Sequence, residues 1–338
     1  SYFARKQQET TPYTENVNIV IAGHDDDYMS PSTKGLIVST LFAAAYFIRP
    51  IHMALPIVMI AYGNLVVRLF AYLSLLIIVI SFFTAPKPAP MLVTHLLSPM
   101  LEYFQYDEII ENSPIHIHES IVDGKQYIFA CQPHGIIPFC SVAWSIRQAT
   151  NHRKIVPTAV ASLVLHTPLL KHFMGMFGCV TAATMRKQLE TKQVPCVRLY
   201  VGSTTETFYC DEETETLHLT KRKKFIKIAL QMGVDVIPVY MFGNTTVYSP
   251  LKNFVLIKLS DWFQFPCTWV FGRYYLPIPK KQKLLYVSGQ PLGLPQIKRP
   301  KSFHVDKWHK KYCEQVARLF EEYKERHPAY KNKKLVIV

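Results

Sequence analysis

The fold of this chain is decided around residues 127–135, which read YIFACQPHG. The apolar and β-forming residues Tyr127–Cys131 predict a buried strand. Pro133 and Gly135 then predict a tight turn that presents His134 at the end of that strand. Ligands of open α/β sheets bind beyond the carboxyl ends of the strands, so a catalytic base would sit in this turn. A histidine in a turn is also a common structural feature, and the pattern alone leaves both interpretations open.

Strands and helices alternate along the rest of the chain. Three further apolar runs predict strands, Cys196–Val201, Val234–Tyr240 and Leu284–Ser288. Apolar residues at helical spacing predict one helix over Arg222–Met232, ended by Gly233, and another over residues 305–323. Strands that alternate with helices indicate an α/β domain, which we place at residues 85–338.

A long apolar segment precedes this domain. Residues 35–84 contain only two charged side chains, Arg49 and Arg68. A helix that spans a bilayer needs about 20 apolar residues, so this segment is long enough for a membrane hairpin of two transmembrane or re-entrant helices. A hydrophobic core segment of a soluble protein is the alternative, which the shortage of polar residues disfavours.

The turn of this hairpin is predicted at Gly63-Asn64, with legs near residues 36–62 and 65–83. The first leg contains two prolines, so we expect a kink in it. The run APKPAP at residues 85–90 then ends the hairpin and acts as a stiff linker.

Charge is unevenly spread over the chain, which has a net charge of +14 although 49% of its residues are hydrophobic. Residues 1–34 are polar and acidic, so we expect a disordered segment without a cleavable signal peptide. The basic excess lies beyond residue 90 and indicates an anionic partner: nucleic acid, an anionic lipid surface or a phosphorylated cofactor. The apolar segment and the lack of an ordered aromatic–basic motif argue against nucleic acid.

The cysteines favour a reducing environment. There are seven, an odd number, and no two of them form a CxxC pair. Several lie in apolar runs, so we expect buried, reduced thiols rather than a disulfide framework or a zinc site. No metal site is predicted.

Three more motifs follow the first. Residues 197–206, VRLYVGSTTE, predict a strand that enters a small polar loop closing on Glu206. Such a loop offers backbone N–H groups to an oxyanion or a phosphate, and its carboxylate could orient a histidine, although an ordinary surface turn has the same composition. Residues 221–230, KRKKFIKIAL, place cations at a helix N-terminus, where they oppose the helix dipole unless an anion such as the phosphates of CoA binds there. Residues 237–244, IPVYMFGN, predict a buried strand that leads to a glycine turn.

In this order and spacing, the four motifs resemble the type-2 diacylglycerol acyltransferase family, which includes monoacylglycerol and wax-alcohol acyltransferases. That family is typified by (H/Y/E)PHG, VGGxxE, RKGFxKLA and PVYxFGEN motifs after an N-terminal membrane hairpin. The likeness runs from about residue 35 to the end of the chain. Three positions depart from the pattern: Ser203 and Lys224 stand where the family has glycine, and Thr245 stands where an acidic or polar neighbour is usual.

The resemblance implies a glycerolipid-acyltransferase-like fold, with a mixed sheet flanked by helices behind the hairpin. It implies the esterification of diacylglycerol to triacylglycerol with acyl-CoA as co-substrate and no other cofactor. Monoacylglycerol or a long-chain alcohol is the alternative acceptor. By position, His134 falls on the family's essential histidine, and Glu206 is our candidate for its partner. The substrate-binding positions that the resemblance implies are Pro133, Gly135, Gly202, Arg222 and Lys223.

The implied location is the endoplasmic reticulum membrane, multi-pass, or the surface of lipid droplets, with the catalytic domain and both termini in the cytosol. The sequence leaves the oligomeric state open, with a homo-oligomer among the alternatives. The expected mechanism is a ternary complex in which His134 takes the proton of the acceptor hydroxyl. Two rivals remain: an acyl-enzyme on Cys131 or Cys140, and a non-catalytic membrane module that binds lipid.

Overall fold

The structure is a computed structural model that describes residues 33–47, 49–111, 125–202, 204–263 and 268–338. The disorder predicted for residues 1–34 therefore concerns a segment that lies almost wholly outside the described residues.

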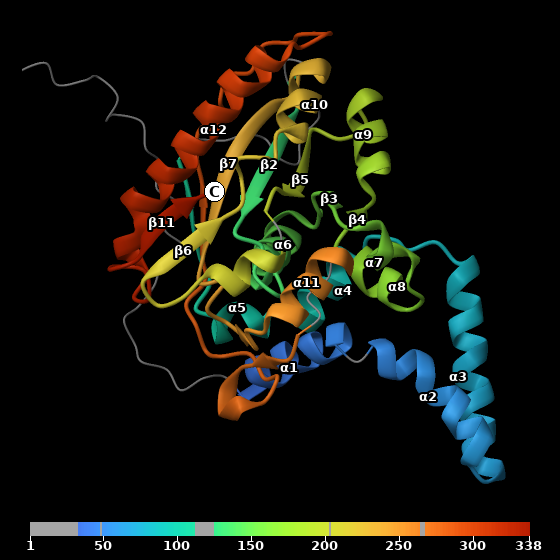
Figure 1. Ribbon diagram of the computed structural model, residues 1–338. Coiled ribbons are helices and arrows are strands. Elements are labelled where there is room, and N and C mark those ends of the chain that lie inside the picture. Colours follow the sequence, from blue (N-terminus) through green and yellow to red (C-terminus); the bar gives the residue numbers. More distant parts are fainter. Residues whose placement is uncertain (1–32, 48, 112–124, 203, 264–267) are drawn as a thin grey trace, which may run out of the picture.

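A seven-stranded mixed sheet forms the centre of the molecule (Figure 1). Its strands, in spatial order, are β1 (Asp107–Ile110), β10 (Leu285–Ser288), β7 (Asp235–Phe242), β2 (Tyr127–Gln132), β5 (Cys196–Tyr200), β3 (Thr158–Ala159) and β4 (Cys179–Val180). The strands from β7 to β4 are parallel, whereas β10 is antiparallel to β7 and parallel to β1. The four predicted strands are confirmed as β2, β5, β7 and β10, each within two residues at either end.

Helices cover both faces of the sheet (Figure 1). One face is covered by α9 (Ala182–Glu190), α10 (Lys224–Met232) and α12 (Ser302–Tyr323). The other is covered by α6 (Phe139–His152) together with α1 (Thr33–Phe47), α4 (Pro90–Leu97) and α5 (Pro99–Tyr103). The two predicted helices of the domain are confirmed as α10 and α12.

Shorter elements complete the domain. They are the helices α7 (Ser162–His166), α8 (Leu170–Gly175), α11 (Phe254–Phe263), η2 (Thr204–Tyr209), η3 (Arg273–Tyr275) and η4 (Lys324–Arg326), the parallel pair β6 (Thr214–Leu217) and β11 (Lys334–Ile337), and the antiparallel pair β8 (Ser249–Pro250) and β9 (Val270–Phe271).

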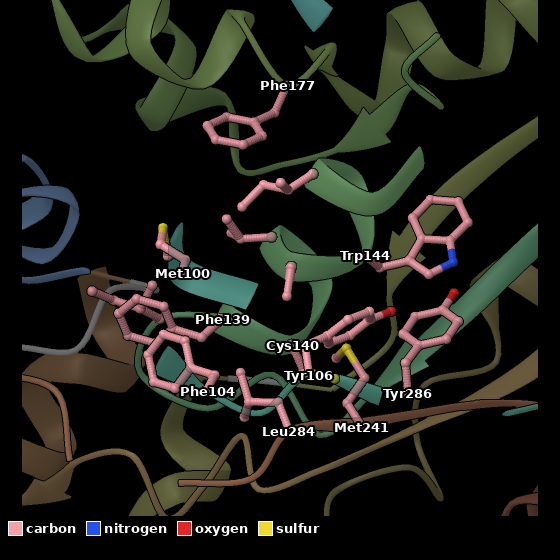
Figure 2. Close-up of a cluster of buried hydrophobic side chains, with 14 of the residues drawn as sticks. Met100, Phe104, Tyr106, Phe139, Cys140, Trp144, Phe177, Met241, Leu284 and Tyr286 are labelled. Carbon is pink, nitrogen blue, oxygen red and sulfur yellow. The ribbon is translucent and has the colours of Figure 1, made fainter. Parts of the chain in front are cut away.

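The central strands bury side chains on both faces, as expected for parallel strands between helix layers. Ile128 and Ala130 of β2 pack under α10 and α12, whereas Phe129 and Cys131 pack under α6. Figure 2 shows the α6 side of the core, where Trp144 stacks on Tyr286 with ring centroids 5.4 Å apart. Full burial of a large apolar side chain stabilises a fold by about 1.5–3 kcal/mol, so these two layers hold the sheet edge that carries the predicted site.

The described residues of the apolar segment form the helices α1, α2 and α3. α2 (Arg49–Tyr62) and α3 (Leu65–Phe83) are joined at the predicted turn, where Asn64 caps α3 by accepting a hydrogen bond from the Val67 N–H, 3.0 Å away. The part of the expected first leg up to Phe47 is α1, whose Phe42 and Ala43 are buried in the core of the domain. α2 and α3 extend away from the sheet (Figure 1).

α3 is the one helix of the described residues that is long and apolar enough to cross a membrane. It has 19 residues, a mean hydropathy of 2.5 over its most apolar window, and only 17% of that window buried inside the protein. A core helix of a soluble protein would be mostly buried, so the exposed apolar side chains of α3 require another explanation.

Candidate active site

Three of the four sequence motifs meet at one edge of the sheet. β7, β2 and β5 are neighbouring parallel strands, with Gln132 paired with Tyr240 and Cys131 paired with Tyr200. Their carboxyl ends therefore lie side by side, and the loops that follow them carry the Pro-His-Gly turn, the loop before Glu206 and the Gly-Asn turn. The position that the sequence predicted for a catalytic group is the one at which the topology gathers these loops.

His134 is held in a single tautomer by its neighbour. Its Nδ1 lies 2.8 Å from the carbonyl oxygen of Gly135. A carbonyl oxygen can only accept, so Nδ1 carries the proton and Nε2 keeps a lone pair. Burial lowers the pKa of His134 below its usual 6.5, although the hydrogen bond to Gly135 opposes this shift. The imidazole is therefore neutral at physiological pH and can accept a proton at Nε2.

Asn244 fixes the loop that carries His134. Its side-chain amide donates to the carbonyl oxygens of Pro133, 2.9 Å away, and of His134. Its Oδ1 accepts from the backbone N–H of Cys140 at 3.1 Å, which ties the loop to the start of α6. No role was predicted for Asn244 from the sequence. Its position directly after a buried strand and a glycine, at the edge that holds the other motifs, was a signal for one.

Gly135 is required by the same contact. Its φ is +67°, and a Cβ at this position would lie 2.6 Å from the carbonyl oxygen of Asn244. Any other residue would be strained and would push the Pro-His-Gly turn away from the Gly-Asn turn.

Gly202 and Glu206 form a unit of their own. A Cβ on Gly202 would lie 2.3 Å from Oε2 of Glu206, so the glycine makes room for a fully buried carboxylate. Oε1 of Glu206 accepts a hydrogen bond from the backbone N–H of His218 at 2.8 Å. The hydrogen bonds seen here join His134 to Gly135 and Glu206 to His218, so a direct pairing of His134 with Glu206 stays a prediction.

The cations of the third motif, at residues 221–224, point in two directions. Lys223 turns to α12, where its Nζ lies 2.7 Å from Oδ1 of Asp306. Lys221, Arg222 and Lys224 instead line a cavity of about 810 Å³ beside the end of β5. Of the two cations predicted to bind substrate, Arg222 faces this basic cavity and Lys223 is engaged in an ion pair.

A second cavity, of about 280 Å³, contains the histidine. We call it the reaction cavity; His134, Gly202 and Arg222 lie on its wall. Most of its other lining is apolar and comes from α1, α6 and the α8 region, including Phe42, Tyr46, Ile137, Val142, Met174 and Phe177. Leu199, Tyr200 and Arg222 line both cavities, which therefore adjoin.

The cysteines beside the histidine are poor nucleophiles. Cys131 and Cys140 are fully buried, and desolvation raises the pKa of Cys131 to about 12 and that of Cys140 well above its usual 9.0. The thiolate is the reactive form of cysteine, and neither side chain reaches it near neutral pH. This geometry favours a histidine base over an acyl-cysteine.

A neutral histidine lies at the carboxyl edge of an α/β sheet, between a basic cavity and an apolar one, and this arrangement makes it a candidate acid–base group of an α/β enzyme. The family model for diacylglycerol acyltransferases matches residues 100–338, and the chain belongs to this family of acyltransferases.

The names of the similar proteins describe acyltransferases that act on lipids. The chain is 28% identical to the acyl-CoA wax alcohol acyltransferase 1 of Mus musculus over 234 residues, which cover 64% of this chain and 71% of that protein. It is 26% identical to the diacylglycerol O-acyltransferase 2 of Danio rerio over 239 residues, 64% of this chain and 66% of that protein. Among solved structures, the 1-acyl-sn-glycerophosphate acyltransferase PlsC of Thermotoga maritima aligns over 86% of this chain and 97% of its own, with a TM-score of 0.43 and 13% identity.

Proposed function

We propose that this chain transfers a fatty acyl group from acyl-CoA to the free hydroxyl of diacylglycerol, with His134 as the general base. The observation that carries the proposal is the position of His134 in an apolar cavity that adjoins a basic one. The reaction joins a lipid, which needs an apolar site, to a thioester of a phosphorylated carrier, which needs cations. Membership of the diacylglycerol acyltransferase family supports the same reaction.

The mechanism follows from the tautomer of His134. Nε2 takes the proton of the acceptor hydroxyl as its oxygen attacks the thioester carbonyl carbon. The tetrahedral oxyanion is stabilised by backbone N–H groups of the loops near Gly135 and Gly202. The C–S bond then breaks, the ester is released, and CoA leaves as a thiolate that receives the proton from the imidazolium. Glu206, buried beneath Gly202, keeps that loop in place and is the candidate partner of the histidine.

Arg222 occupies the position expected for a group that binds the carrier. It lines both cavities, so a CoA phosphate held there would leave the thioester at the entrance to the reaction cavity. Lys221 and Lys224 extend the same basic surface and offer further charge-assisted hydrogen bonds to phosphate oxygens. Pro133 and Gly135 contribute by holding His134 rather than through side chains of their own.

A long-chain alcohol is the second candidate acceptor, and the wax alcohol acyltransferase relatives favour it. The two acceptors are separated by expressing the chain in cells that lack neutral-lipid acyltransferases and identifying the accumulated ester by mass spectrometry. Triacylglycerol supports the proposal, wax ester supports the alternative, and no new ester from an expressed, folded chain refutes both.

We further propose that α2 and α3 anchor the enzyme in the endoplasmic reticulum membrane or at lipid droplets, with the α/β domain in the cytosol. The apolar, exposed surface of α3 supports insertion, and the basic excess of the domain supports an anionic cytoplasmic leaflet as its neighbour. Protease protection of the C-terminus in sealed microsomes would contradict the orientation.

A further inference from the structure

Arg198 is a buried cation in the wall of the reaction cavity. It lies on β5, two residues before Tyr200, so both side chains leave the same face of the strand. Only 2% of its surface is exposed, yet it lines the reaction cavity beside Ser145 and Thr158. The ring of Tyr200 contacts that of His134, with centroids 4.7 Å apart, so the guanidinium lies one strand repeat deeper than the ring that touches the base. One such repeat is about 6.5 Å.

The partners of Arg198 carry no charge. Its Nε and one terminal nitrogen donate to Oγ1 of Thr158 at 3.0 and 2.7 Å, and the same terminal nitrogen donates to Oγ of Ser145 at 2.6 Å. The other terminal nitrogen donates to the carbonyl oxygen of Ser141 at 2.8 Å. The guanidinium carbon also lies 4.9 Å from the ring centre of Trp144. A guanidinium has five N–H donors, and these bonds use four of them.

The other buried cation, Lys333, is paired with a carboxylate. Within the described ranges, Lys333 is the only other cationic side chain that is fully buried, and its Nζ lies 3.1 Å from a carboxylate oxygen of Glu215. Buried charges are normally paired in this way, because removing a charge from water is costly. Within these same described ranges, no carboxylate forms an ion pair with Arg198. A negative or strongly dipolar oxygen supplied by a ligand would compensate the charge of the guanidinium.

We propose that Arg198, with Ser145 and Thr158, binds an ester carbonyl oxygen of a glycerolipid acceptor and so selects glycerolipids over simple long-chain alcohols. This inference rests on the proposed function and specifies its acceptor. In diacylglycerol, the carbon next to the one that bears the free hydroxyl carries an ester group. With the hydroxyl at His134, that ester extends along the wall that leads past Tyr200 to Arg198. A long-chain alcohol places methylene groups against the guanidinium and leaves its charge uncompensated, and sites built to bind a polar group reject analogues that lack it.

The first test needs no variant. The purified full-length chain is assayed with acyl-CoA and two acceptors, 1,2-diacylglycerol and its 1,2-dialkylglycerol analogue, in which ethers replace the esters. We expect a KM about tenfold or more higher for the dialkylglycerol, because the ether lacks the carbonyl oxygen. Equal KM values for the two acceptors would overturn the role of Arg198 but leave the acyltransferase proposal intact. Acylation of neither diacylglycerol nor any other alcohol would instead refute the proposed function.

The second test assigns the effect to Arg198. Arg198→Met should raise the KM for diacylglycerol about tenfold with little change in kcat, should abolish the preference for the ester over the ether, and should leave the KM for a long-chain alcohol unchanged. Arg198→Lys should recover part of the preference. Arg186→Met is the matched control, because Arg186 is exposed on α9 and paired with Glu190. An equal loss with every acceptor would show that Arg198 only braces β5 against α6, and would overturn the inference.

Discussion

The side-chain amide of Asn244, at the end of β7, donates a hydrogen bond to the backbone carbonyl oxygen of His134, at the end of β2, over a distance of 2.5 Å. The two residues are 110 positions apart in the chain. The Gly-Asn turn of one motif is therefore part of the support of the histidine in another, and these two motifs form one structural unit rather than two separate sites.

Removing this support should lower both stability and activity. Asn244→Ala removes three hydrogen bonds, two of them buried, and leaves at least one backbone group without a partner, at a cost of about 1–3 kcal/mol. We expect the thermal unfolding midpoint to fall because these hydrogen bonds are lost. We expect kcat to drop at least tenfold because the Pro-His-Gly turn is no longer fixed. Asn151→Ala, at an exposed position on α6, is the control and should alter neither quantity. Normal kcat in Asn244→Ala would contradict the supporting role.

His134→Ala should remove most activity and leave the fold intact. Positioned acid–base catalysis typically contributes about 10²- to 10⁴-fold, so we expect a loss of at least that size in kcat for triacylglycerol synthesis in isolated membranes. The side chain is only partly buried and its hydrogen bond goes to the next residue, so the unfolding midpoint should change little. His152→Ala, an exposed position on α6, should keep full activity. Retention of most activity by the His134 variant would refute the assignment of the base.

The pH dependence tests the protonation state of the same group. Burial lowers the pKa of His134 below 6.5, so the neutral, active base persists as the pH falls past 6.5 and is lost only below the lowered value. We expect kcat/KM for the acceptor, measured between about pH 5 and 8, to stay level through neutral pH and to fall at the acidic end. An inflection at or above 6.5 that disappears in a His134 variant would mean that the imidazole is not desolvated as the structure shows.

Gly202→Ala should be more harmful than a typical glycine replacement. Its new Cβ would meet the buried carboxylate of Glu206 at 2.3 Å, so the carboxylate or the loop must move, at a cost of about 1–3 kcal/mol. We expect a lower unfolding midpoint and at least a tenfold lower kcat. Gly293→Ala is the control, because its φ of +77° brings backbone strain without any neighbour within 4 Å. That variant should lose some stability but keep its activity, and equal activities in the two variants would show that the Gly202 loop is not part of the site.

Arg222 and Lys223 should differ although they are adjacent. Arg222→Ala removes a cation from the wall shared by the two cavities, and we expect the KM for acyl-CoA to rise about tenfold or more, as for the loss of a charge-assisted hydrogen bond. Lys223→Ala removes only an exposed ion pair with Asp306, so its effect should be below about threefold. The effect of Arg222→Ala should shrink at high salt. Equal changes in both variants would place the phosphates elsewhere.

The sequence predicted what depends on local chemistry. The strand that leads to His134, the three loops at the sheet edge and the turn at Gly63-Asn64 all carry turn residues directly after apolar runs, and the structure has each of them where expected. Parallel strands place their carboxyl ends at one edge, so the position of the site followed once the strands were known.

The remainder depends on contacts between distant residues. The ion pair of Lys223 joins residues 83 positions apart, and the bond from Asn244 to His134 joins residues still further apart, so neither has a local signal. β3 and β4 are two residues long, too short for any periodicity to indicate. The uncompensated charge of Arg198 could not be predicted either, because an arginine in an apolar run gives no sign of whether an acidic side chain will face it.

The burial of α1 in the core of the domain has a practical consequence. Phe42 and Tyr46 of α1 form part of the wall of the reaction cavity, although they belong to the stretch that a hydropathy profile would assign to the bilayer. Trimming the whole stretch to obtain a water-soluble enzyme would open that wall and yield an inactive protein. Excising residues 49–80 alone, with a short flexible bridge in their place, would preserve both this wall and the hydrogen bond from the Leu169 N–H to Ser81 that holds the segment before α8, and would give a water-soluble enzyme for crystallography.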